Sequence, residues 1–296
     1  MVTDEAGYWV PDWPAPQGVR GAVTLRGGGV SRGPYASFNL GDHVGDAPKA
    51  VAGNRERLRA VLKLPGEPCW LRQVHGTEVA TLPAAPARIP EADGAVTGMP
   101  GVVLAVLTAD CLPVLACSRS GRQVGVFHAG WRGLLAGILE RGVAAMRVAP
   151  EEILIYLGPA IGPGHFEVGP EVRAAFLAVD AGAAGAFRRG PGDRWLANIY
   201  ELARRRLRGA GVRAIFGGDL CTVADPARYF SYRRDGVTGR MASLIWKEGG
   251  EHGGFAICGN GAADHGYGAD RRHAGAPGRH LAGDSGDRGG GRGAAD

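Results

Sequence analysis

The chain has 296 residues, of which 45% are hydrophobic and 21% charged, a balance that is ordinary for a globular protein and excludes global disorder. Its longest aliphatic run, Val102–Leu107, is far shorter than the roughly 20 residues that span a bilayer, and no apolar signal segment precedes it. We therefore expect a cytoplasmic protein with no membrane partner. The net charge of +5 is scattered, and its one short cluster, residues 204–206, is predicted to be a solvated helix face, so no nucleic-acid partner is expected.

Five cysteines are present, an odd number, and no two of them have CxxC spacing. Because nothing indicates secretion, this pattern argues against a disulfide framework. Each cysteine is expected to be a small buried side chain unless it serves as a metal ligand or a nucleophile.

Residues 1–246 alternate between patterns typical of strands and helices. The first helix is predicted over residues 48–64, where Asp46 can cap the N-terminus and Val51 and Leu58 lie on an apolar stripe. Residues 102–107 are apolar throughout, as in a buried strand. The further predicted strands are 70–74, 113–117, 123–127, 153–157 and 214–217, and the further predicted helices are 132–146, 170–179 and 197–209. This order predicts a single domain of mixed α/β (α+β) class, with a central mixed sheet flanked by helices.

The chain changes character after Trp246. Residues 247–296 hold 16 of the 51 glycines and four of the eight histidines, and no apolar periodicity survives there. Such a segment cannot bury enough surface to offset its chain entropy. We predict a catalytic domain over residues 1–246 and a Gly-rich, disordered tail over residues 247–296.

Chemistry-bearing side chains stand at the ends of two predicted strands. His128 ends one strand, and Cys111 follows another beside Asp110. If the hairpin turn between these strands centres on residues 119–121, Cys111 or its neighbour faces His128, with Cβ atoms about 4.5–5.5 Å apart. The sequence therefore predicts that a thiolate and an imidazole meet at one end of the sheet.

This juxtaposition fits two interpretations. One is a Cys–His pair for nucleophilic catalysis. The other is a zinc site formed by Cys111 and His128, with His75, which follows the strand predicted at 70–74, as the third ligand. A Cys-His-His set that leaves a fourth position open is typical of catalytic zinc.

Two further segments carry polar groups without a specific fingerprint. Residues 26–31 are rich in glycine but match neither a GxxxxGK[ST] loop nor a dinucleotide fingerprint, so a hairpin turn is predicted there. Residues 231–236 are typical of a polar turn whose arginines can meet an anionic substrate.

Seven motifs follow one another along the chain: RGPYASFNLG at 32–41, LRQVHG at 71–76, TADCLP at 108–113, HAGWRG at 128–133, GPAIG at 158–162, CT at 221–222 and FSYRRDGVTGR at 230–240. Taken in this order, over about residues 20–246, they resemble the YfiH/YlmD family, also called the laccase-like or multicopper polyphenol oxidase family. The chain departs from the family at Gly164 and Phe166, where Cys and Tyr are common, and it continues past Trp246, near which the family normally ends.

The resemblance implies a mixed α/β fold and one zinc ion held by His75, Cys111 and His128. It also implies phosphorolysis of adenosine, inosine, guanosine and methylthioadenosine to the base and ribose-1-phosphate, together with deamination of adenosine. Relatives have been described as copper polyphenol oxidases, and bacterial members are linked to peptidoglycan editing, the removal of misplaced serine.

The leading hypothesis is therefore a zinc-dependent purine nucleoside phosphorylase with adenosine deaminase activity, acting on small molecules as a monomer or small homo-oligomer. Cys111 and His128 are expected to be catalytic as metal ligands, and Asp110 is expected to transfer protons. The residues expected to bind substrate are Arg26 and Arg132, which would hold phosphate, and the polar groups Asn39 and Gln73.

Three alternatives stay open. The first is an amidohydrolase acting on muropeptide precursors with misincorporated serine, in which Cys111 is the nucleophile and His128 the base. The second is a copper polyphenol oxidase, which ranks lower because four histidines before the tail cannot readily build the several sites that multicopper oxidation needs. The third is a zinc-stabilised binding protein without turnover.

Overall fold

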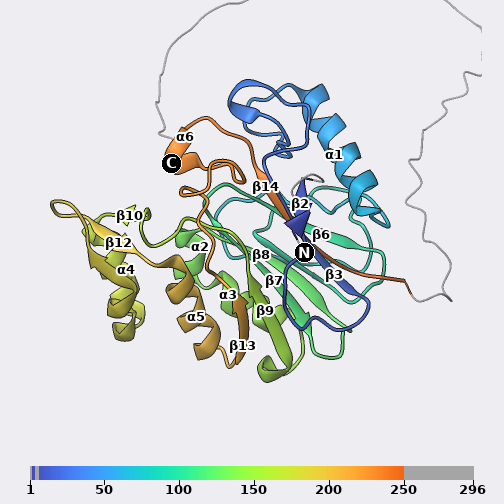
Figure 1. The fold of residues 1–296 in the computed structure, drawn as a ribbon. Helices are drawn as coiled ribbons and strands as arrows, with labels where there is room; N and C mark the ends of the chain where they lie inside the picture. The colour runs from blue at the N-terminus through green and yellow to red at the C-terminus, as the bar shows by residue number, and fades with distance from the viewer. Residues whose placement is uncertain (1, 4–6, 250–296) are drawn as a thin grey trace, which may run out of the picture. The chain divides into compact units, whose positions relative to one another are not determined.

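Strands from distant parts of the chain form two large sheets (Figure 1). The computed structural model describes residues 2–3 and 7–249. The tail predicted over 247–296 lies outside the described residues, apart from its first three. Among the described residues, no helix has the length and apolar character needed to cross a membrane.

The elements follow one another in mixed order. The strands are β1 (Val2–Thr3), β2 (Tyr8–Trp9), β3 (Val19–Thr24), β4 (Val79–Thr81), β5 (Gly94–Thr97), β6 (Val103–Thr108), β7 (Leu112–Ser118), β8 (Val124–Ala129), β9 (Ile153–Leu157), β10 (Glu167–Val168), β11 (Phe187–Arg189), β12 (Trp195–Ala197), β13 (Ala214–Gly217) and β14 (Met241–Lys247). The α-helices are α1 (Pro48–Leu62), α2 (Trp131–Ala136), α3 (Ile138–Ala145), α4 (Pro170–Val179), α5 (Ile199–Gly209) and α6 (Tyr232–Asp235). The short 3-10 helices are η2 (Gly33–Tyr35), η3 (Pro150–Glu152) and η4 (Ala181–Ala186).

The two large sheets differ in the number and the direction of their strands. One has five strands in the order β1-β2-β3-β14-β6, all antiparallel, and the other has six in the order β13-β9-β7-β8-β5-β4. In the six-stranded sheet, β13 runs parallel to β9 and β4 parallel to β5, while the other pairs are antiparallel. The mixed α/β class predicted from the sequence is confirmed, with the strands divided between two main sheets and a small third one, β10-β12-β11.

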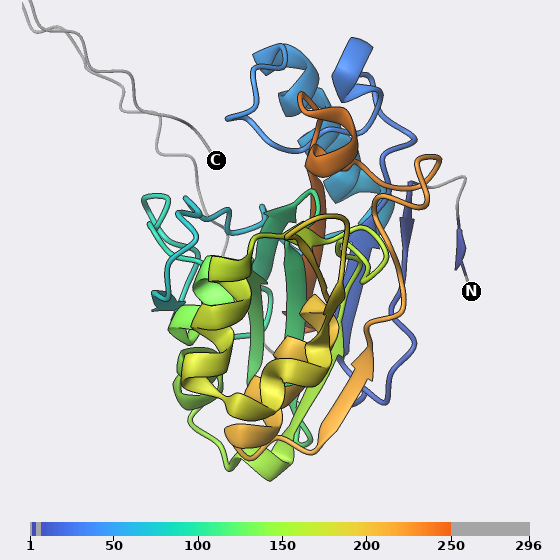
Figure 2. The ribbon, with the colours of Figure 1, turned by 90° about the vertical axis from the view of Figure 1, so that its left-hand side faces the viewer.

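Apolar side chains arrange the described residues in four layers. Between the two sheets lies a core that includes Leu104, Leu115 and Val126. The outer face of the six-stranded sheet packs against α2–α5, which lie in front of the strands in Figure 2. The outer face of the five-stranded sheet packs against α1 through residues that include Leu58 and Leu244. Both sheets are therefore buried on both faces, which explains why their central strands are apolar throughout.

The alternation of side chains along β7 divides that strand between two cores. Leu115 and Cys117 face the other sheet, whereas Val114 and Ala116 face the helices. All four are fully buried. The hairpin β7–β8 is thus the centre of the fold, and His128 is carried by its second strand.

Three sequence predictions need correction. The helix predicted over 132–146 is two helices, because Gly137 takes a left-handed conformation (φ 103°) between α2 and α3. The segment 70–74 is not a strand: it makes a single isolated bridge, Arg72 with Glu91, and the residue before it, Cys69, makes another with Leu104. The final strand of the described residues is β14 rather than 214–217, although the apolar run 241–246 carried the signal.

The hairpin register also differs from prediction by one residue. Pro113, and not Cys111 or Leu112, pairs with His128. The reason lies in the turn: Gly121 donates to the Ser118 carbonyl, and Ser118 and Gln123 are joined by hydrogen bonds, so the turn centres between residues 120 and 121. Leu112, the first residue of β7, pairs with Ala129. Cys111 therefore lies one residue before the strand and has no partner in the hairpin register.

We predict that Gly142→Ala destabilises the protein by about 1–3 kcal/mol, because a Cβ on Gly142 would lie 2.6 Å from the buried Phe127 ring. The matched control is Gly209→Ala, in another helix, where a Cβ would meet nothing within 4 Å. That change is expected to leave stability unchanged or to raise it by up to about 1 kcal/mol. Urea denaturation followed by circular dichroism measures both, and equal effects would contradict close packing at Gly142.

Candidate metal centre

Three side chains from distant segments converge at one end of the six-stranded sheet. His75 lies in the loop before β4, Cys111 in the connection between β6 and β7, and His128 in β8. Their ligand atoms all lie within 4.8 Å of one another, and Cys111 Sγ lies 3.7 Å from His75 Nε2. The two imidazole rings have centroids 4.8 Å apart and planes inclined at 73°. This group could hold a metal ion.

The backbone around the cluster adopts conformations that few residues take. His75 has φ 59° and Asp110 has φ 95°, both in the positive-φ region that few residues other than glycine occupy. Gly130 passes so close to the cluster that a Cβ there would lie 2.7 Å from the His75 ring and 3.1 Å from Cys111 Sγ. The glycine of the HAGWRG motif is therefore required by the approach of the ligands, and the two positive φ values are of the kind that functional sites hold.

Asp93 organises this cluster, and sequence reasoning missed it. Its carboxylate is fully buried and accepts hydrogen bonds from the backbone N–H groups of Val74, His75 and Gly76 at 2.7–3.2 Å. It also lies 2.8 Å from His128 Nδ1, which leaves Nε2 as the ring nitrogen that can meet a metal. Asp93 thus fixes the loop that carries one ligand and the ring orientation of another.

Electrostatics favour the thiolate of Cys111. Burial acts to raise the pKa of this thiol, but the charge of His128 and hydrogen bonds with His128 and His75 outweigh burial and lower the pKa to about 6. Burial acts to lower the pKa of His128, whereas the Cys111 charge and the hydrogen bond with Asp93 raise it to about 9. The thiol is therefore in the form that binds metals at neutral pH.

Burial acts to raise the pKa of Asp93, as it does for Cys111. The hydrogen bond from His128, the charge of His128 and the backbone N–H donors outweigh burial and hold the pKa of Asp93 below its usual value. Asp93 is thus a carboxylate, able to accept from all its donors. This is the arrangement in which a carboxylate orients a metal-binding imidazole.

Asp110, predicted to transfer protons, is held in a network. Its carboxylate accepts from the Thr222 hydroxyl at 2.5 Å and from the Arg233 backbone N–H at 2.6 Å. Its own carbonyl accepts from the N–H of Ile161. The two carboxylate bonds join the connection that carries Cys111 to segments more than 100 residues further along the chain, and the carbonyl bond joins it to the loop after β9.

The polar groups predicted to bind substrate are used by the fold. The Gln73 amide donates to the Leu107 carbonyl and accepts from the Leu107 N–H, both at 2.8 Å. Asn39 is fully buried, and its amide joins Gly41, Asp46 and Arg240. Both side chains therefore hold loops together within the described structure.

The two arginines predicted to hold phosphate differ in their surroundings. Arg26 donates to the carbonyls of Ala36 and Pro226, and its guanidinium lies 4.9 Å from the centroid of the Phe230 ring. Arg132, four residues after His128, is exposed and stacks on its neighbour Trp131 with its guanidinium carbon 4.8 Å from the ring centroid. Arg132 is thus the more exposed of the two, since the Arg26 side chain is half-buried.

Arg240 is a further residue near the cluster that sequence reasoning missed. Its guanidinium donates to the carbonyls of Thr238 and Gly239. Burial lowers its pKa, while the charges of Cys111 and Asp110 act to raise it. The Arg240 cation therefore lies within electrostatic reach of Cys111 and Asp110, and the TGR end of a motif already noted was the available signal.

The chain is similar to known proteins over most of its length. The family model "Multi-copper polyphenol oxidoreductase laccase" matches residues 20–248. The purine nucleoside phosphorylase YfiH of Escherichia coli (strain K12) is 56% identical over 237 residues, which cover 80% of this chain and 97% of that protein. A purine nucleoside phosphorylase of Pseudomonas aeruginosa is 54% identical over 241 residues, 81% of this chain and 98% of that one.

Two solved structures share the fold. A Neisseria meningitidis protein has 48% sequence identity and a TM-score of 0.79, covering 82% of this chain and all of that chain. YlmD from Geobacillus stearothermophilus has 32% identity and a TM-score of 0.77, covering 82% of this chain and 97% of that chain.

We predict that Asp93→Asn weakens metal binding by about 10–100-fold, since an amide cannot replace a carboxylate that accepts from three backbone donors and an imidazole. Competition with a chromophoric chelator at fixed pH measures the affinity. Asp180→Asn is the control, because that carboxylate pairs with Arg205 instead. Equal affinities in the two variants would show that Asp93 does not orient the ligands.

Proposed function

The chain belongs to the YfiH/YlmD family, whose family model is described as multi-copper polyphenol oxidoreductase laccase, and we propose that it is a zinc-dependent purine nucleoside phosphorylase. The observation that carries this proposal is the His75–Cys111–His128 group in a chain that is 56% identical over 80% of its length to a relative named purine nucleoside phosphorylase. The substrates proposed are adenosine, inosine, guanosine and methylthioadenosine, each with inorganic phosphate.

The donor set supports zinc as the resident metal. One thiolate and two imidazoles are typical zinc ligands, and three protein ligands leave a fourth position open, as in catalytic sites. The same set is poor for a multicopper centre, since the described residues hold only one group of three or more His, Cys, Asp or Glu side chains that could bind a metal. When bound, zinc supplies a Lewis acid that polarises a substrate atom.

The residues around the cluster perform the other tasks. Cys111 contributes negative charge at the site, and Asp93 keeps His128 in one orientation through Nδ1. In phosphorolysis the bond from the sugar to the purine nitrogen breaks and a bond to a phosphate oxygen forms, with a sugar that carries positive charge between them.

We assign phosphate to Arg132 rather than Arg26. The Arg132 guanidinium is exposed, whereas the Arg26 donors already meet backbone carbonyls. Arg132 also lies close to His128 in the chain, because it is in the first turn of α2. An arginine fork matches the oxygens of phosphate in pairs.

The same metal centre is proposed to deaminate adenosine. Both reactions take a purine nucleoside and both need a charge-stabilising group beside the ring, so one site serves them. Asp110 is proposed to keep the Cys111 connection in place, because its carboxylate oxygens both accept protein hydrogen bonds.

We predict that the purified zinc-loaded protein releases adenine from adenosine only when phosphate is present, as measured by liquid chromatography. His75→Ala and Cys111→Ser are expected to lower the rate by about 100-fold or more, since each removes a metal ligand. Inosine formed without phosphate would report the deaminase activity separately.

His43→Ala is the matched control for His75→Ala, because His43 is exposed and lies beside Asp42 rather than in the cluster. Its activity is expected to equal that of the unchanged protein. A zinc-loaded protein that turns over no purine nucleoside would overturn the proposed function.

A further inference from the structure

A second thiol–imidazole pair lies outside the metal cluster. Cys221 Sγ is 3.4 Å from His165 Nδ1. Cys221 follows β13 in the chain, and His165 lies in the loop between β9 and β10. The pair therefore joins two connections on one side of the six-stranded sheet, where Cys221 forms an isolated bridge with Ala160.

Two backbone donors also point at this sulfur. The N–H of Gly162 lies 3.2 Å from Cys221 Sγ and the N–H of Ala224 lies 3.4 Å from it. Gly162 can approach only because it lacks a side chain: a Cβ there would lie 2.9 Å from the sulfur. Amide donors stabilise a sulfur that carries negative charge, as they stabilise other anions.

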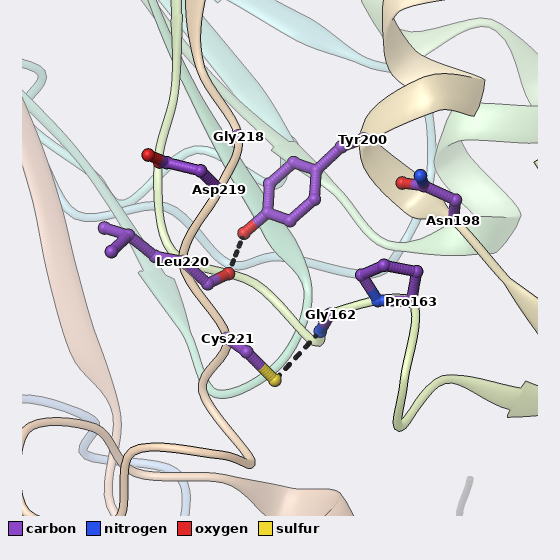
Figure 3. A pocket seen from close by; sticks show the side chains of 8 residues that line it. All are labelled: Gly162, Pro163, Asn198, Tyr200, Gly218, Asp219, Leu220 and Cys221. Carbon is purple, nitrogen blue, oxygen red and sulfur yellow. Dashed lines mark hydrogen bonds between the residues drawn. The ribbon is translucent and has the colours of Figure 1, made fainter.

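A pocket of about 170 Å³ opens beside the pair. Figure 3 shows Cys221 and Gly162 close together, with the rings of Pro163 and Tyr200 nearby and the Tyr200 hydroxyl bonded to the Leu220 carbonyl. Asn198, Gly218 and Asp219 complete the lining. Its walls are mainly apolar, so it suits a small molecule with an organic group. The thiol thus has both a base at hydrogen-bond distance and a space in which a reactant can lie.

The other described cysteines lack this combination. Cys69 and Cys117 are buried, whereas Cys221 is half-buried and His165 is exposed. Burial alone raises the pKa of Cys117 to about 12. Cys111 is engaged with the two histidines of the metal cluster. Cys221 is therefore the described cysteine that combines access, an imidazole and amide donors without belonging to that cluster.

We propose that Cys221 is a modification site, oxidised by small organic hydroperoxides with His165 as the acid–base partner. His165 takes the thiol proton, and the thiolate sulfur attacks the terminal oxygen of the hydroperoxide. The O–O bond breaks, the sulfur–oxygen bond forms, and the departing alkoxide takes the proton back from His165. The products are a sulfenic acid at Cys221 and an alcohol, so the thiol is oxidised by two electrons and the peroxide is reduced.

The test uses the full-length protein treated with tert-butyl hydroperoxide in the presence of dimedone, which traps sulfenic acids. Mass spectrometry of peptides then reads each cysteine separately, including Cys258. Cys221 is expected to be trapped about 10-fold faster than Cys69 and Cys117, and His165→Ala and His165→Asn are expected to slow trapping at Cys221 by about 10-fold or more.

His43→Ala is again the control, because it removes an exposed imidazole far from the pair in the chain, and it is expected to leave trapping unchanged. Circular dichroism establishes that each variant is folded. Trapping at Cys221 no faster than at Cys117, or equal rates with and without His165 in folded protein, would overturn the proposal. The readout does not depend on nucleoside turnover, so it stands or falls separately from the proposed phosphorylase activity.

Discussion

The arrangement of the metal cluster depends on one buried carboxylate. Asp93 meets three successive backbone N–H groups of the His75 loop and the Nδ1 atom of His128 with its two oxygens. Its own carbonyl accepts from the N–H of His128, so the residue holds that histidine at both the backbone and the side chain. Burying a charge costs free energy unless the charge has several hydrogen-bond partners. For Asp93 these partners are the His75 loop and the His128 ring, which must both be held in place for the site to form. The same bonds that offset burial of Asp93 therefore set the ligand geometry.

The second constraint is the passage of the chain from one sheet to the other. Strand β6 belongs to the five-stranded sheet and β7 to the six-stranded sheet, so the connection at Ala109–Cys111 crosses between them. Asp110 makes this turn at φ 95° and bonds to Thr222 and Arg233. Cys111 is thereby presented at the junction of the two sheets, next to His128 on β8. A crossing of this kind needs a tight turn, and the tight turn brings the thiol out of the strand towards the histidines.

Sequence periodicity predicted the elements whose faces are buried in a regular way. The β7–β8 hairpin, α1, α4 and α5 belong to this class, since apolar residues at fixed spacing report burial directly. The segment 70–74 misled because the Gln73 side chain, and not the backbone, bonds to Leu107. Asp93 carried no signal, because Asp followed by Gly reads as a turn and nothing local reveals that its partners lie 17 to 35 residues away. Hydrophobic periodicity indicates which face of an element is buried. It does not indicate which distant backbone group a polar side chain such as Gln73 or Asp93 bonds to.

The two thiol–imidazole pairs show how one fold gives similar groups different chemistry. Cys111 lies among two imidazoles, so its charge is balanced by groups that can share a metal ion. Cys221 has one imidazole and two amide N–H donors, which stabilise a thiolate but supply no further metal ligand. The pairs are nevertheless connected: Thr222, next to Cys221, donates to Asp110, next to Cys111. The segment that carries Cys221 and the turn that presents Cys111 are therefore joined directly by the hydrogen bond between Thr222 and Asp110, although the two sulfurs have different partners.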